Sequence, residues 1–197
     1  YDIYGSQGNQ STQLKRNVMV TDAPDTTLPV ITLAGGVEIS HEAGTVFVDP
    51  GFSAADDRDG DLTAKVVVTG TVDTANLGTY TLSYNVSDAA GNAAVAVTRK
   101  VTVTDTTAPI LSLKGEAETN VEGGTDYTDA GATVTDSFEG DLNASLTVDN
   151  PVETSKLGED TVTYSAKDSS GNESTITRQV IVEDTIAPVI SLKGEAT

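Results

Sequence analysis

The sequence predicts an all-β protein, built as an extended array of tandem β-sandwich domains. One pattern recurs along the chain: an alternating strand ends, a turn of Asp, Thr and Pro follows, and a new apolar strand begins. Its prolines, Pro29, Pro109 and Pro188, are spaced by 80 and 79 residues, and a fixed period of this size indicates a repeat array. Thr, Val, Gly, Asp and Ala dominate over helix formers, which favours short strands and turns.

The period divides the chain into two whole repeats and two partial ones. We expect residues 1–22 to supply the last strands of a preceding repeat and residues 185–197 the first strand of a following one. Residues 23–105 and 106–184 should each form a complete domain. A repeat of this length can bury only a modest core, which agrees with an aromatic content of 5%.

Strands and turns alternate densely within the first whole repeat. Tyr80, Leu82, Tyr84 and Val86 alternate with polar residues, the period of a half-buried strand. The second repeat follows the same order but lacks one residue between Asn172 and Arg178, which we place in the last strand or at its bulge. The predicted strands of the first repeat are Val30–Leu33, Val37–Ser40, Val46–Ala54, Lys65–Thr69, Tyr80–Val86 and Val95–Val103.

Five motifs occur in a fixed order: Asp25-Thr-Thr-Leu-Pro-Val-Ile31, Gly-Thr followed by Asp-Pro-Gly, Asp-Gly-Asp-Leu, Leu-Gly-Thr-Tyr and Asp-x-x-Gly-Asn. Together they resemble the bacterial immunoglobulin-like repeat named for pesticidal crystal proteins, which is similar to hyalin-type repeats. The resemblance covers both whole repeats and extends into both partial ones, with mild departures at Asp129-Ala-Gly131 and Glu139. It implies tandem immunoglobulin-like β-sandwich domains of a secreted or surface protein, and it implies no activity, because this fold hosts many functions.

The charge balance excludes two classes of partner. The formal net charge is −19, and the 11 basic residues are scattered, whereas binding to nucleic acid or to an anionic membrane surface needs clustered Lys and Arg. No apolar run is long enough to span a bilayer. A strongly acidic chain fits a self-repelling, extended molecule or one that collects cations.

Strand directions predict where the acidic segments meet. We name the end at which the chain enters a repeat its N-terminal pole. We expect the first two short strands to run away from this pole, the third to run back, the fourth to run away and the fifth to run back, because the last strand has to leave at the far end. The acidic loop after the third strand and the turn after the fifth then both lie at this pole, where the linker also arrives. In the first repeat these segments are Asp22 to Asp25, Asp56 to Asp61, and the turn that begins at Asp88.

Such a gathering of carboxylates is costly, because two unit charges a few ångströms apart repel by about 1 to 4 kcal/mol. Calcium, which takes six to eight oxygen ligands, would offset this cost, and we therefore hypothesise calcium sites at the junctions. The alternative is ordinary turn chemistry with solvated charge, since Asp and Gly are standard turn residues; melting in excess Ca²⁺ and in EDTA separates the two. The candidate ligands are Asp22, Asp25, Asp56, Asp57, Asp59, Asp61, Asp88, Asp105, Asp136, Glu139, Asp141, Asp168 and Asp184.

Three arginines occupy equivalent places in the last strand of a repeat. Arg16, Arg99 and Arg178 each lie in phase with apolar residues two positions away. An arginine on the apolar face either lies at a bulge or pairs with a carboxylate across the sheet. We expect a structural role for all three.

These features favour a non-enzymatic structural or adhesive module: an extracellular spacer, stalk or filament segment of a bacterial surface or secreted protein. Its partners would be neighbouring repeats of the same chain, with self-assembly or a cell-surface or glycan ligand in addition. The alternative is an accessory module of a larger secreted enzyme or toxin that binds glycan or protein. Sugar platforms need exposed aromatic faces, and the chain has no Trp. No nucleophile and base recur together, so no enzymatic activity is expected.

Overall fold

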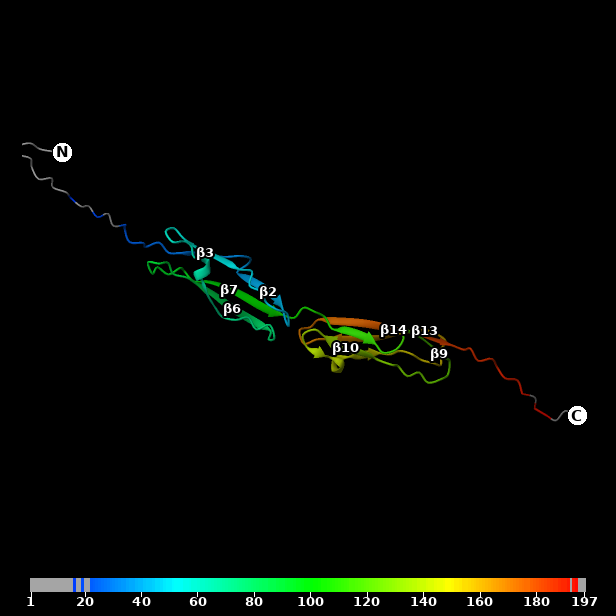
Figure 1. The fold of residues 1–197 in the computed structure, drawn as a ribbon. Helices are drawn as coiled ribbons and strands as arrows, with labels where there is room; N and C mark the ends of the chain where they lie inside the picture. The colour runs from blue at the N-terminus through cyan, green and yellow to red at the C-terminus, as the bar shows by residue number, and fades with distance from the viewer. Residues whose placement is uncertain (1–15, 17–18, 20–21, 192, 195–197) are drawn as a thin grey trace, which may run out of the picture.

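The computed structural model describes residues 16, 19, 22–191 and 193–194, which contain two β-sandwich repeats placed end to end (Figure 1). Repeat 1 contains the strands β1 to β7 and repeat 2 the strands β8 to β14. The strands predicted before residue 22 lie outside the described residues. None of the described residues after Glu183 is in a strand.

Repeat 1 consists of a three-stranded sheet in the order β1-β3-β4 and a four-stranded sheet in the order β2-β7-β6-β5. Strand β2 runs parallel to β7, and the other pairs are antiparallel. The strands are β1 (Val30–Leu33), β2 (Glu38–Glu42), β3 (Phe52–Asp56), β4 (Gly60–Asp61), β5 (Val67–Thr69), β6 (Gly78–Asn85) and β7 (Val97–Thr104), with a 3-10 turn η1 at Thr63–Lys65.

Repeat 2 has the same topology. Its sheets have the orders β8-β10-β11 and β9-β14-β13-β12, and β9 runs parallel to β14. The strands are β8 (Ile110–Leu113), β9 (Glu118–Glu122), β10 (Ala132–Asp136), β11 (Gly140–Asp141), β12 (Thr147–Asp149), β13 (Gly158–Lys167) and β14 (Glu173–Glu183), with a 3-10 turn η2 at Asn143–Ser145. The prediction of an all-β fold with tandem domains is confirmed.

Each core lies between the two sheets of its repeat. In repeat 1, Leu82 and Tyr84 of β6 pack with Ile31 of β1 and Ala54 of β3. In repeat 2, Val162 and Tyr164 of β13 are fully buried in the same way. The period-2 pattern of repeat 1 therefore identified β6 correctly as a half-buried strand.

The predicted strand Val46–Ala54 is too long at its start. Strand β3 begins only at Phe52, and the preceding residues cross from one sheet to the other. Gly51 has a φ of 102°, in the left-handed region that glycine favours, and its N–H donates to Asp49 Oδ1 at 2.7 Å. This local turn breaks the strand although Val46 and its neighbours have high strand propensity.

The one-residue difference between the two repeats lies at a bulge in repeat 1, one of the two places predicted for it. In repeat 2, β13 and β14 pair without interruption down to Lys167 opposite Glu173. In repeat 1, regular pairing stops at Tyr84 opposite Val97, and the residues beyond it resume only as an isolated bridge, shifted by one position. One extra residue in one strand of an antiparallel pair has this effect.

The arginines of the last strands pair with carboxylates, the second of the two predicted alternatives. Arg99 is fully buried; its guanidinium forms an ion pair with Asp49 and donates to three backbone carbonyls. Tyr84 Oη donates to the other oxygen of Asp49 at 2.5 Å, and burial together with this carboxylate raises the pKa of Tyr84 to about 12. The corresponding residues of repeat 2 are Arg178, Asp129 and Tyr164. Arg16 is exposed and lies outside the described strands.

Candidate metal centre

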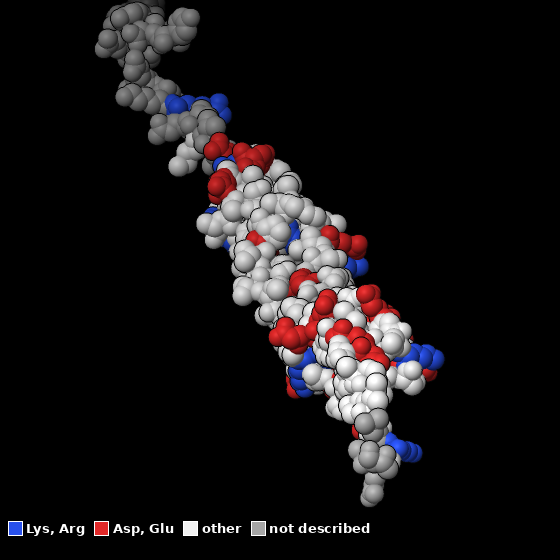
Figure 2. Space-filling view, turned by 90° about the vertical axis from the view of Figure 1, so that its right-hand side faces the viewer, with Lys and Arg blue, Asp and Glu red and all other residues white. Residues whose placement is uncertain are grey.

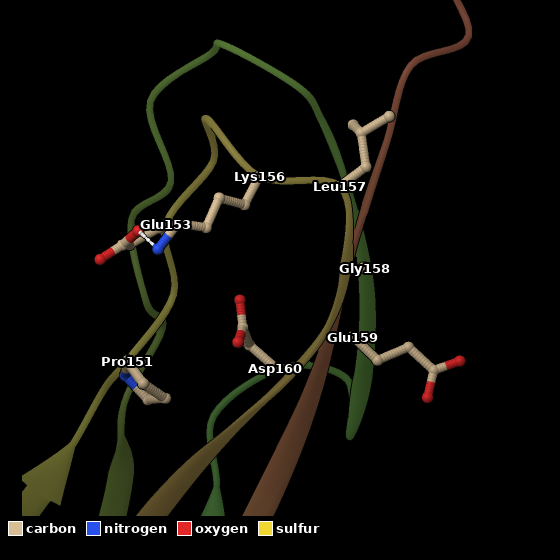
Figure 3. A pocket seen from close by; sticks show the side chains of 7 residues that line it. All are labelled: Pro151, Glu153, Lys156, Leu157, Gly158, Glu159 and Asp160. Carbon is tan, nitrogen blue, oxygen red and sulfur yellow. Dashed lines mark ion pairs between the residues drawn. The ribbon is translucent and has the colours of Figure 1, made fainter.

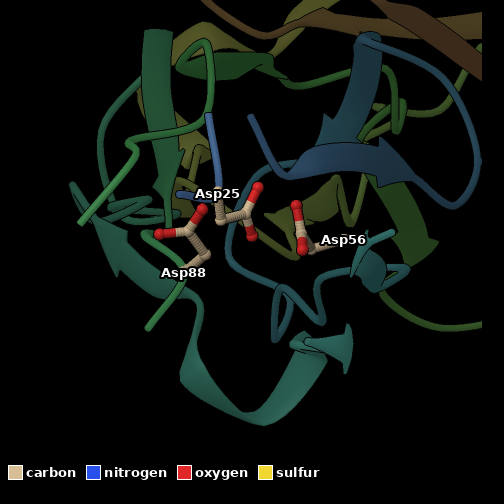
Figure 4. Close-up of side chains that lie close together, drawn as sticks. All are labelled: Asp25, Asp56 and Asp88. Carbon is tan, nitrogen blue, oxygen red and sulfur yellow. The ribbon is translucent and has the colours of Figure 1, made fainter. Parts of the chain in front are cut away.

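Three acidic residues meet at the N-terminal pole of repeat 1, as the strand directions predict. Asp25 comes from the linker, Asp56 from the end of β3 and Asp88 from the turn after β6, and carboxylate oxygens from all three lie within 4.8 Å of one another. Figure 4 shows their carboxylates turned into one space. Figure 2 shows acidic side chains gathered where the chain enters this repeat.

A second cluster lies at the joint between the repeats. Asp105 directly follows β7, so it belongs to the linker that leaves repeat 1. One of its carboxylate oxygens lies within 4.8 Å of oxygens from Glu139 and Asp168, which belong to repeat 2. Acidic groups from both repeats therefore lie close together at the junction.

Local hydrogen bonds explain why these loops fold as they do. Asp136 Oδ1 accepts the N–H groups of Phe138 at 2.7 Å and Glu139 at 2.9 Å, which closes the loop after β10. Asp168 Oδ1 accepts the N–H groups of Gly171 at 2.6 Å and Asn172 at 2.8 Å. Turn chemistry of this kind is typical of aspartate, and it accounts for one oxygen of each carboxylate.

Turn chemistry does not account for one carboxylate oxygen in each of two residues at the junction, Asp105 and Asp136. Asp105 is 6% exposed and Asp136 is 7% exposed, and the Oδ2 atom of each is buried without a hydrogen-bond partner. Asp56 Oδ2 at the pole of repeat 1 has the same property. A buried polar atom without a partner costs about 1–3 kcal/mol, and more when it is charged, so each of these oxygens requires an explanation.

The electrostatics of the junction also favour a cation. Burial raises the pKa of Asp105, and the carboxylates of Asp136 and Asp168 raise it further. The pKa of Asp168 is lowered, although burial opposes this, because hydrogen bonds from Asn172 and the turn backbone stabilise its anion. A fixed anion therefore stands beside a carboxyl group whose ionisation is resisted, and a divalent cation between them would stabilise both as anions.

The donor set fits calcium. It contains only oxygen atoms, the ligands that Ca²⁺ and Mg²⁺ prefer, and neither the histidine nor the cysteine typical of zinc sites. Calcium–oxygen bonds are about 2.3–2.6 Å long, so oxygens on opposite sides of one ion lie roughly 5 Å apart. The separations of up to 4.8 Å in both clusters agree with this span.

Seven predicted ligands lie outside the two groups of three. Asp136 is one of them, but it is buried and close enough to Asp105 to act on its charge. The other six are exposed: Asp22, Asp57, Asp59, Asp61, Asp141 and Asp184. Asp61 and Asp141 instead lie two residues before the 3-10 turns, where their Oδ1 atoms accept the N–H groups of Thr63 at 2.8 Å and Asn143 at 2.9 Å.

One residue of the junction was missed in the sequence. The side-chain amide of Asn172 donates to Asp168 Oδ2 at 2.8 Å and to the backbone oxygens of Asp105 at 3.2 Å and Thr107 at 3.3 Å. It thus ties the linker to the turn that carries Asp168. The recurrence of Gly-Asn after each late Asp was the available signal, because Asn92 makes the corresponding contact with the oxygen of Asp25 at 3.2 Å.

The opposite pole of repeat 2 has a different character. A shallow pocket is bordered by the loop before β13, where Lys156 pairs with Glu153 and Asp160 points inward while Glu159 points away (Figure 3). Within the described part of the chain, groups of three acids at metal-ligand spacing occur at the two N-terminal poles and not here.

Fold and clusters together define a tandem immunoglobulin-like sandwich with acidic junctions. The family model for the Ig-like domain of bacterial surface proteins matches residues 31–103 and again residues 111–182. The chain therefore belongs to this family and contains two copies of its domain. None of the helices in the described segments is long and apolar enough to cross a membrane.

Similar proteins include one animal relative and a bacterial structure. Hyalin from Strongylocentrotus purpuratus is 32% identical over 182 residues, which is 87% of this chain but only 15% of hyalin; this confirms the resemblance to hyalin. A structure of the M60 catalytic domain with two CBM51 domains, from Clostridium perfringens ZmpB, matches with a TM-score of 0.50 and 13% identity, over 93% of this chain and 33% of that one. At this identity the match shows a shared fold alone.

Proposed function

We propose that the chain is a non-enzymatic spacer segment of an extracellular bacterial surface or secreted protein, and that calcium stiffens its junctions. The observation that carries the proposal is the pair of buried, unpartnered oxygens, Asp105 Oδ2 and Asp136 Oδ2. They lie where one repeat joins the next, and they come from different repeats.

The arrangement suggests how calcium would act on the shape of the molecule. Asp105 continues directly from the last strand of repeat 1, while Glu139 and Asp168 are carried by loops of repeat 2. An ion held by all three would cross-link the two domains. It would also remove the mutual repulsion of the carboxylates, which otherwise favours separation of the repeats.

The family supports the surface location, because its domains are described from bacterial surface proteins. Further repeats of the same chain are the natural neighbours at both poles, with self-assembly or a cell-surface ligand in addition. The narrower kinship with repeats of pesticidal crystal proteins stays a prediction, based on the order of the five motifs. No activity is proposed, because the acidic clusters offer ligands for a metal and no nucleophile.

The alternative, an accessory glycan-binding module, has weaker support. A structure that shares the fold carries CBM51 domains beside a catalytic domain. Stacking on a sugar needs an exposed aromatic face, and the tyrosines of the described residues are fully buried at Tyr84 and Tyr164 and partly buried at Tyr80 and Tyr127. A glycan-array screen with the whole chain would test this alternative.

The proposal that calcium binds at the junctions is tested by thermal unfolding of the whole chain in excess Ca²⁺ and in EDTA. Ligand at a hundredfold excess over its Kd stabilises by about 2.7 kcal/mol, which corresponds to a rise in Tm of roughly ten degrees or more for a domain of this size. Asp136→Asn should reduce the rise, whereas Asp141→Asn, in the same loop but outside the cluster, should preserve it. Equal melting temperatures in the two media would reject the calcium proposal.

A further inference from the structure

A glutamate of repeat 1 holds the linker immediately after Asp105. Glu42 Oε1 accepts the N–H groups of Thr106 at 3.0 Å and Thr107 at 3.1 Å, and it also accepts the hydroxyl of Thr107 at 2.7 Å. Glu42 Oε2 accepts the hydroxyl of Thr106 at 2.6 Å. One carboxylate therefore fixes two successive residues through both backbone and side chain.

The position of this contact follows from the sheet. Glu42 is the last residue of β2, and the parallel pairing places it opposite Thr104, the last residue of β7. The side chain at the end of β2 thus lies beside the point where the chain leaves the sheet. The hydrogen bonds from Thr106 and Thr107 lower the pKa of Glu42 to about 2, because they stabilise its anion.

The linker is also held from the other side. The amide of Asn172, in repeat 2, donates to the backbone oxygens of Asp105 and Thr107 at 3.2 and 3.3 Å. The three residues from Asp105 to Thr107 are therefore fixed to repeat 1 by Glu42 and to repeat 2 by Asn172. With its backbone fixed on both sides, Asp105 holds its carboxylate, including the buried and unpartnered Oδ2, beside the carboxylates of Glu139 and Asp168.

We propose that Glu42 is a positioning residue for the metal centre at the junction. It does not reach the cluster of Asp105, Glu139 and Asp168 itself. It orders the linker before a cation arrives, so that Asp105 is already in place as a ligand, and preorganisation of this kind raises affinity. This inference rests on the proposed function, because it assigns a role to Glu42 at that same site.

The same contact recurs in repeat 2 and provides a matched control. Glu122, the last residue of β9, accepts the N–H of Thr185 at 3.0 Å and its hydroxyl at 2.6 Å. Thr185 follows Asp184, which occupies the place of Asp105 but is exposed and outside the acidic clusters of the described residues. Glu122 is thus chemically equivalent to Glu42 and distant from the junction.

The test compares Glu42→Gln with Glu122→Gln in the whole chain, titrated with Ca²⁺ and followed by backbone amide NMR. The amides of Ser169 and Gly171 report the junction, and those of Ala89 and Gly91 report the pole of repeat 1. Loss of a group that orients a ligand typically costs roughly tenfold or more in metal affinity. We expect Glu42→Gln to weaken the junction site by that amount and to leave the pole of repeat 1 unchanged, while Glu122→Gln leaves both unchanged.

The outcomes separate the two proposals. If the wild-type chain binds calcium at the junction and Glu42→Gln binds it equally well, the positioning role is wrong and the proposed function stands. If both glutamine variants weaken both sites alike, the effect is general and the positioning role is again rejected. If the wild-type junction binds no calcium, the calcium function fails and the role of Glu42 fails with it.

Discussion

Replacement of Asp105 by Asn should change the stability of repeat 2 in opposite directions with and without calcium. Oxygens of Asp105, Glu139 and Asp168 lie within 4.8 Å of one another. At this separation one pair of unit charges repels by about 0.9 kcal/mol in water and by about 3.5 kcal/mol at an effective dielectric constant of about 20. Asp105→Asn removes two such pairs, so in EDTA the variant should be more stable than wild type by at least about 1 kcal/mol.

Calcium should reverse this order. The amide oxygen of an asparagine is a neutral and weaker ligand than a carboxylate, and every tenfold loss in affinity removes about 1.4 kcal/mol of stabilisation at saturating ligand. Wild type should therefore gain more from calcium than Asp105→Asn gains. We expect the variant to be the more stable protein in EDTA and the less stable one in millimolar Ca²⁺.

Urea unfolding at pH 7 in both media measures this, with repeat 2 followed by its own NMR signals because two domains need not unfold in one step. Asp184→Asn is the control: it occupies the same place after β14, is exposed, and its Oδ1 accepts only the N–H of Ile186 at 3.3 Å. An exposed substitution should stay within about 0.5 kcal/mol in either medium. If Asp105→Asn destabilises the protein in EDTA as well, the carboxylate of Asp105 contributes more through its hydrogen bonds than it costs through repulsion, and the reasoning is refuted.

Three further predictions concern the cores and the joint. Arg99→Ala should destabilise repeat 1 by about 3 kcal/mol in urea unfolding, because it leaves the partly buried carboxylate of Asp49 without its cation and three backbone carbonyls without their donor. A loss under about 1 kcal/mol would contradict this. Burial alone would raise the pKa values of Asp49 and Asp129, but hydrogen bonds from tyrosine and the charge of the arginine outweigh burial, so the net pKa of each carboxyl is lowered. The stability that these carboxylates provide is therefore complete above about pH 4 and is lost as the pH falls further. A circular-dichroism titration that shows these ion pairs failing between about pH 5 and 7 would refute that sign. Phe138 of repeat 2 approaches the turn after β2 in repeat 1. Phe138→Ala should therefore broaden the distribution of distances between spin labels placed on the two repeats, and it should leave the unfolding of repeat 1 unchanged.

The sequence predicted the parts of the fold that depend on local pattern. Alternation identified Leu82 and Tyr84 as core residues. The in-phase position of Arg99 left a bulge and a carboxylate partner as alternatives, and the structure shows the carboxylate partner. The strand Val46–Ala54 was predicted too long, because Val46 and Val48 have the composition of a strand although both are largely exposed, at 86% and 77%. Whether such a segment pairs or crosses between sheets depends on which neighbour it meets, and that is settled by tertiary structure.

At the candidate metal site, too, the sequence predicted what depends on chain direction and did not predict what depends on tertiary contacts. The directions of the strands predicted which acidic segments meet, because the pole at which a loop lies depends on the direction of the strand before it and not on the side chains. They did not predict which oxygens remain without a partner, because Asp61 and Asp136 both accept backbone N–H groups in turns and are distinguished only by how deeply the surrounding loops bury them. Glu42 could not be recognised, since its contacts with Thr106 and Thr107 span more than sixty residues and depend on the end of β2 lying beside the end of β7.

The two N-terminal poles have related ligands but different surroundings, and this difference predicts an order of calcium binding. At the junction, two unpartnered oxygens belong to residues that are only 6% and 7% exposed; at the pole of repeat 1, Asp56 has such an oxygen and Asp25 is only partly buried. Charges attract more strongly where water is excluded, and a ligand already desolvated gives up less water when it binds. The junction should therefore fill first, with the amide signals of repeat 2 saturating at lower Ca²⁺ than those of repeat 1. If the pole of repeat 1 saturates first, the burial of the carboxylates does not set their affinity, and the number of exposed acids around each pole becomes the better explanation.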